Sequence, residues 1–177
     1  MEKVYELIDK YVSLLYISRI LTLHGGNNNC LDSSFSDIDF YKLGLNEELL
    51  KYIKENSSAK NLRMFLPIFL ELCDEVSREV FGSIIKLSTD EKLQLKEHLE
   101  SRIICNMPII DKYQTTYLTI VSEIEKTNDS NKNNIRELGK LAKINFNKLY
   151  EYNFYNQHYS NLVSYVKGML GATLIKK

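Results

Sequence analysis

Apolar side chains recur every three or four residues along most of this chain, and this spacing limits what it can fold into. In the first such segment the apolar positions are Val4, Leu7, Ile8, Tyr11, Leu14, Leu15 and Leu21. A period near 3.6 places residues of this kind on one face of an α-helix. Only two prolines, Pro67 and Pro108, interrupt the 177 residues. The sequence therefore predicts an all-α protein.

The length and the charge of the chain narrow its classes of function. A chain of 177 residues is long enough to bury one core and too short for two, so residues 1–177 are expected to form a single helical domain. Lysine and arginine number 23, as do aspartate and glutamate. This balance gives no bulk charge that would favour nucleic acid or an acidic partner. Any electrostatic function must come from local patches.

Turn and capping signals divide the chain into a bundle of about six or seven helices. The expected helices cover approximately residues 3–24, 46–56, 57–87, 88–107, 108–126, 132–150 and 152–170. Residues 25–45 carry loop signals and are expected to be irregular. Pro67 predicts a kink or a break, because proline lacks the N–H of the helical ladder. Pro108 predicts the first turn of a separate helix, with Asn106 as its cap.

No metal or cofactor site is predicted. The three cysteines, Cys30, Cys73 and Cys105, are far apart and fit free thiols in a reducing compartment. The acidic N-terminus does not resemble a signal peptide, so a cytoplasmic or inner-membrane-associated protein is expected. The apolar segment 11–23 is shorter than the roughly 20 residues that span a bilayer. It predicts a buried core helix, with an interfacial or pore-associated helix as the alternative.

Arg19 and His24 lie at the end of the first helix with four residues between them. Histidine can transfer a proton near neutral pH and arginine can stabilise a phosphorane, so such a pair suits cleavage of RNA. The spacing resembles the arginine, four to six residues, histidine motif of the HEPN superfamily, small helical proteins that include many metal-independent ribonucleases. That family usually has a polar residue after the arginine, where this chain has Ile20. The alternative interpretation pairs Arg19 with a carboxylate and leaves His24 to cap the helix end.

Size, helicity and this divergent pair together resemble the HEPN-like accessory protein of type VI-B CRISPR loci. The resemblance implies an accessory role in an RNA-targeting antiviral system, a homo-oligomer, membrane contact through a pore, and RNA or an RNA-guided effector as partner. It also implies that Arg19 and His24 form a degenerate motif. Two alternatives stay open. One is a HEPN endoribonuclease that uses this pair. The other is an RNA-binding small subunit of a type III CRISPR complex, because residues 159–167 resemble the last helix of that family.

Charged side chains form two stripes of opposite sign at helical spacing. The basic stripe consists of Lys132, Arg136, Lys140 and Lys143. It suits a phosphate backbone, and the alternative is an ordinary solvated helix face. The acidic stripe consists of Glu71, Asp74, Glu75 and Glu79. Because the signs are opposite, the two stripes are a third candidate contact, within the fold or between subunits.

Aromatic residues are concentrated in the last predicted helix. Three tyrosines begin a stripe at helical spacing that continues with apolar residues, and the stripe consists of Tyr152, Tyr155, Tyr159, Leu162, Val166 and Met169. The stripe predicts packing in a core or between subunits, and the alternative is stacking of the rings on unpaired bases.

Overall fold

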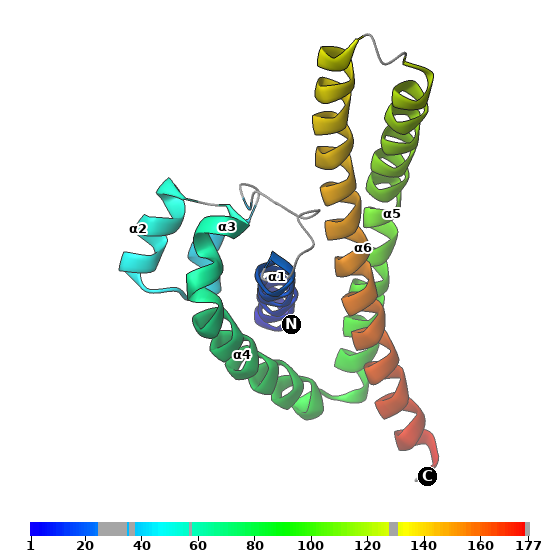
Figure 1. Cartoon of the computed structure of the whole chain (residues 1–177). Helices are drawn as coiled ribbons and strands as arrows, with labels where there is room; N and C mark the ends of the chain where they lie inside the picture. The colour runs from blue at the N-terminus through cyan, green and yellow to red at the C-terminus, as the bar shows by residue number, and fades with distance from the viewer. Residues whose placement is uncertain (25–34, 36–37, 57, 128–130, 176–177) are drawn as a thin grey trace.

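The computed structural model describes residues 1–24, 35, 38–56, 58–127 and 131–175. These residues form helices and no β-strand (Figure 1), which confirms the all-α prediction. Much of the irregular segment predicted at 25–45 lies outside the described residues. Within it, the structure gives a short 3-10 helix, η2 (Phe40–Leu43), which ends at Gly44 in the left-handed conformation (φ 73°) that glycine tolerates best.

Helix α1 (Glu2–His24) is the centre of the fold. Figure 1 shows it nearly end on, with α4 on one side and α6 on the other, and it packs against both. Its buried residues are spread around most of the helix and include Ile8, Val12, Leu14, Ile17, Ile20 and Leu21. A helix that is apolar on most sides is typical of a protein interior. Segment 11–23 is therefore a core helix, as the first of its two interpretations predicted.

The chain then continues through α2 (Glu47–Glu55), α3 (Ala59–Leu62) and α4 (Leu66–Lys86), and the last two of these pack on α1. The break predicted at Pro67 is confirmed. A 3-10 turn, η3 (Arg63–Phe65), separates α3 from α4, and the proline lies in the first turn of α4. A backbone N–H at that position would have no acceptor within the helix, so proline costs no helical hydrogen bond there.

Side-chain caps begin two of these helices at the boundaries that the sequence predicted, near residues 46 and 88. Asn46 accepts a hydrogen bond from the backbone N–H of Leu49 at 2.8 Å, which begins α2. Ser88 and Glu91 form a complete capping box at the start of α5. The hydrogen bonds from the backbone and hydroxyl of Ser88 lower the pKa of the Glu91 carboxyl. Local sequence therefore sets where these two helices start.

Two long helices, α5 (Thr89–Lys126) and α6 (Lys132–Ile175), form an antiparallel hairpin. At 1.5 Å per residue, their 38 and 44 residues extend about 57 and 66 Å. The predicted breaks at Pro108 and near residue 151 are wrong, because both helices continue through these points. The predicted six or seven helices are consequently not confirmed.

The two missing breaks have a common physical reason, which is that the residues around each point pack against other helices. Pro108 is exposed and removes one hydrogen bond of α5 at a cost of about 3 kcal/mol, which the contacts on either side offset. Asn106 is therefore inside a helix, not at its cap. Around residue 151, Glu151 is buried and Tyr150 and Tyr155 pack against the core, so the helix continues without interruption.

Only one end of the hairpin packs against the rest of the molecule. Leu95 and Leu99 of α5 and Tyr159 and Val166 of α6 lie in the same core as α1. Toward the α5–α6 connection, Figure 1 shows the two helices extending away from the rest of the molecule as a layer without a third helix. We call this part, residues 118–126 and 132–145, the hairpin tip. In the described part of the chain, no helix combines the length and the apolarity needed to cross a membrane.

Candidate functional site

Arg19 and His24 both lie near the C-terminal end of α1. Arg19 is exposed and forms no ion pair with another described residue, so the predicted carboxylate partner is not seen. The side chain of His24 lies outside the described residues. On an ideal helix a step of five residues separates two side chains by about 140°. The catalytic use of the pair stays a prediction.

Ile20, which follows the arginine, has a clear structural role. Its side chain is fully buried in the main core, and Ser18 before the arginine is 5% exposed. The Ser18 hydroxyl lies 3.3 Å from the thiol of Cys73 on α4. Burial raises the pKa of that thiol, and Ser18 partly opposes the rise. The residues on either side of Arg19 therefore serve the packing of α1.

The structure places the basic stripe on the hairpin tip. All four of its side chains lie on the exposed side of α6, while Ala142 on the opposite side is buried. Lys140 contacts Glu137 at 2.7 Å, and the other three cations form no ion pair within the described part of the chain. Three unpaired cations on one exposed helical face can bind a phosphate backbone or an acidic protein surface.

The acidic stripe lies on the exposed side of α4. Its four carboxylates form no ion pair among the described residues. Arg78, which lies among them, donates a hydrogen bond from Nε to the backbone carbonyl of Asp74 at 3.3 Å. The interpretation in which the two stripes meet within one chain is therefore not seen.

The aromatic stripe of α6 packs inside the molecule. Tyr159 is 4% exposed, and Leu162 and Val166 are also in the core. Tyr16 of α1 meets Tyr155 edge to face, with ring centroids 5.4 Å apart. The packing interpretation is confirmed for these rings, and they offer no open platform for bases.

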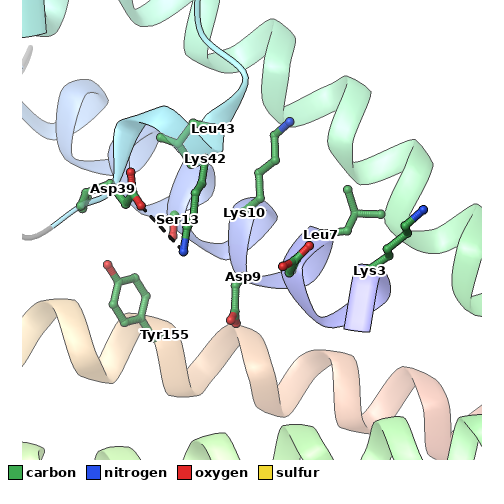
Figure 2. Close-up of a pocket in the computed structure, with 11 residues that line it drawn as sticks. Lys3, Leu7, Asp9, Lys10, Ser13, Asp39, Lys42, Leu43 and Tyr155 are labelled. Carbon is green, nitrogen blue, oxygen red and sulfur yellow. Dashed lines mark ion pairs between the residues drawn. The ribbon is translucent and has the colours of Figure 1, made fainter. Parts of the chain in front are cut away.

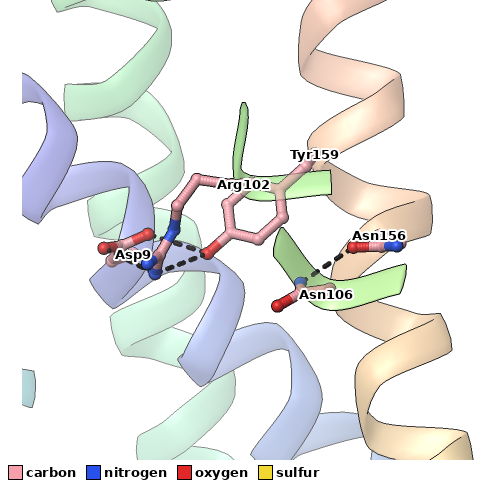
Figure 3. A network of polar contacts seen from close by, with 5 residues as sticks. All are labelled: Asp9, Arg102, Asn106, Asn156 and Tyr159. Atoms are coloured by element: carbon pink, nitrogen blue, oxygen red, sulfur yellow. Dashed lines mark hydrogen bonds and ion pairs between the residues drawn. The ribbon is translucent and has the colours of Figure 1, made fainter. Parts of the chain in front are cut away.

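A polar cluster that no sequence pattern predicted joins α1 to the hairpin (Figure 3). The hydroxyl of Tyr159 donates a hydrogen bond to Asp9 Oδ1 at 2.7 Å, and Arg102 Nη2 lies 3.0 Å from Asp9 Oδ2. Arg102 Nη2 also donates to the Tyr159 hydroxyl at 3.4 Å. One turn along α5, Asn106 donates to Asn156 of α6 at 2.8 Å. Three helices are thus held in register by buried and half-buried polar groups.

The environment of this cluster changes the ionisation of its members. Burial raises the pKa of Tyr159, and the nearby Asp9 carboxylate raises it further. Burial acts to lower the pKa of Arg102, but the facing oxygens of Tyr159 and Asp9 outweigh it and raise the pKa. Burial lowers the pKa of His98, which stacks on Tyr5 with ring centroids 3.8 Å apart. Asp9, Arg102 and Tyr159 bind one another, so the cluster links α1, α5 and α6.

Two pockets flank the cluster and share Asp9, Ser13 and Tyr155. One, of about 390 Å³, lies between α1, α5 and α6. The other, of about 500 Å³, lies between α1, η2 and α6 (Figure 2). Three lysines and three acids line the larger pocket, and Lys42 is paired with Asp39 at 3.7 Å. A lining with balanced charge selects neither an anion nor a cation.

The described residues contain no group of three or more histidine, cysteine or acidic side chains that could hold a metal ion. No protein family, curated protein or solved structure matches this chain. The functional interpretation therefore rests on the geometry of the chain itself, and the charged stripes and the hairpin tip are its most distinctive surfaces.

Proposed function

We propose that this protein is a helical accessory protein that acts by self-assembly and not by catalysis. This is the role implied by its resemblance to the HEPN-like accessory proteins of type VI-B CRISPR loci, in which RNA or an RNA-guided effector is the further partner. The observation that carries the proposal is the hairpin tip. It is two helices thick, and it exposes Leu118, Leu141 and Ile144 to 56, 49 and 57%.

Such a tip has physical features of an interaction surface. Single exposed apolar residues are common, but here they lie on an extended hairpin beside three cations that have no ion pair with a described residue. Two helices that pack only against each other leave much of their surface exposed to water. A second protein that packs against them would bury more of that surface. The burial of Ile20 in the core also favours assembly over RNA cleavage, because the residue after Arg19 is used for packing.

Native mass measurement in buffer and in mild detergent tests the proposal. We expect an oligomer in at least one of the two conditions. A strictly monomeric mass in both would contradict self-assembly. Leakage of dye from liposomes, measured on the same sample, tests whether the assembly acts as a membrane pore.

RNA binding is the second candidate, and the exposure of the basic stripe favours it. Such binding would weaken steeply with salt and would be lost when Arg136, Lys140 and Lys143 are changed to glutamate. A HEPN ribonuclease is a separate alternative that uses the exposed Arg19. Cleavage of RNA that disappears in both Arg19→Ala and His24→Ala would establish it in place of the accessory role.

A further inference from the structure

The two charged stripes lie on opposite sides of one molecule. The basic stripe is on the hairpin tip and the acidic stripe is on α4, and Figure 1 shows α1 between α4 and the hairpin. In the described part of the chain, Lys140 alone among the eight side chains has an ion pair. We propose that the basic stripe of one copy binds the acidic stripe of a second copy. This inference rests on the proposed self-assembly and names its contact.

The spacing of the two stripes supports their pairing. Residues 71, 75 and 79 advance by four, as do residues 132, 136 and 140. Each such step rises about 6 Å and turns about 40° on an α-helix, so both stripes drift around their helices in the same sense. When two such helices face each other, these inclined rows lie along one line if the helices cross at about 50°, so carboxylates can lie opposite cations along that line.

The charges of the two stripes are also balanced. Four carboxylates on α4 are accompanied by Arg78, and four cations on α6 are accompanied by Glu137. Each stripe is thus mainly of one sign and carries a single opposite charge. Since the whole chain has equal numbers of basic and acidic residues, the stripes are a local separation of charge within a neutral molecule.

Exposed apolar side chains lie beside both stripes. Ile68 is three residues before Glu71 and is 38% exposed, and Ile144 is four residues after Lys140 and is 57% exposed. Residues three or four apart are neighbours on a helix face. A contact between the stripes would cover these side chains as well, which adds apolar burial to charge pairing.

A second copy accounts for more of these observations than RNA does. A phosphate backbone would neutralise the basic stripe and leave the acidic stripe without a partner. A second copy neutralises both. Because the two surfaces differ, the contact is heterologous, and a pair of copies keeps one free stripe of each sign, one on each copy, for further copies. The assembly therefore grows into a ring or a filament.

Charge reversal with mixing tests this contact in the full chain. One variant carries Glu71→Lys, Glu75→Lys and Glu79→Lys, so that both of its stripes are basic. The other carries Arg136→Glu, Lys140→Glu and Lys143→Glu, so that both of its stripes are acidic. A control reverses three exposed lysines of α2 and α3, with Lys51→Glu, Lys54→Glu and Lys60→Glu. Association is measured by sedimentation velocity in about 50 mM NaCl, and the helical circular dichroism signal checks that each variant is folded.

We expect each stripe variant alone to self-associate at least about tenfold more weakly than the wild type, because like charges then face each other. An equimolar mixture of the two should regain association, since each acidic stripe again meets a basic one. The control should associate like the wild type. If a triple variant fails to fold, Glu75→Lys and Lys140→Glu are mixed in the same way.

The outcomes that contradict the contact are distinct from those that contradict self-assembly. Association of the wild type that neither stripe variant weakens, or a mixture no better than its components, would overturn the contact and leave self-assembly standing. A wild type that never associates would overturn both. Binding of a single-stranded RNA oligonucleotide is measured on the same proteins. If the variant with Arg136→Glu, Lys140→Glu and Lys143→Glu loses RNA binding but still self-associates, the basic stripe binds RNA and not a second copy.

Discussion

Replacing Tyr159 by phenylalanine removes one hydroxyl from the cluster that joins α1 to the hairpin and keeps the ring. That hydroxyl donates to Asp9 at 2.7 Å and accepts from Arg102 at 3.4 Å. Hydrogen bonds to charged groups contribute about 1.5–3 kcal/mol to stability. The Tyr159 side chain is 4% exposed, but Arg102 and Asp9 are 47 and 41% exposed, so water can replace part of what is lost. We therefore expect the free energy of unfolding to fall by about 1–2 kcal/mol.

Urea unfolding, followed by circular dichroism at pH 7 and at one protein concentration, measures this loss. The midpoint should decrease while the slope with denaturant stays unchanged. Tyr165→Phe is the matched control, because the Tyr165 ring packs on Phe81 at 5.0 Å and its hydroxyl has no hydrogen bond to a described residue. The control should change stability by less than about 0.5 kcal/mol. A Tyr159→Phe protein as stable as the wild type, or an equal loss in the control, would refute the reasoning.

Three further predictions concern α1, Pro108 and one histidine. Ile20→Ala should cost about 2–5 kcal/mol in urea unfolding and Arg19→Ala less than about 0.5 kcal/mol, because the first side chain is buried and the second exposed; equal losses would contradict the placement of α1. Pro108→Ala should raise the thermal midpoint by the equivalent of about 1–3 kcal/mol, since it restores a helical N–H, and a lower midpoint would mean that packing on α6 requires the proline. Burial lowers the pKa of His158, so its contribution to stability is present above the unfolded pKa of about 6.5 and is lost as the pH falls through the folded pKa. An NMR titration midpoint at or above about 6.5 would contradict this direction.

The helical class and several helix starts follow from local sequence. Asn46, Ser88 and Glu91 satisfy backbone groups within three residues of themselves, so their effect is visible without tertiary structure. Pro67 also behaves as its local chemistry predicts, because it lies where α4 begins. These signals hold because the backbone groups that they satisfy lie within a few residues of them in the chain.

The errors arise where packing between distant segments outweighs local preference. Pro108 would end an isolated helix, but α5 continues through it against α6. The cluster of Asp9, Arg102 and Tyr159 joins residues 57 to 150 positions apart, and no spacing rule connects them. Charge patterning did predict both stripes. Whether the stripes meet within one chain depends on the path of the backbone, which the pattern does not contain.

Sedimentation of the wild-type chain over a range of concentrations, in about 50 and about 500 mM NaCl, tests self-assembly through the charged stripes most directly. We expect a mass above the 20.7 kDa monomer that rises with concentration at the lower salt. At the higher salt the mass should fall toward the monomer, because the screening length shrinks to a few ångströms. A mass of 20.7 kDa at every concentration and at both salts would contradict the proposed assembly.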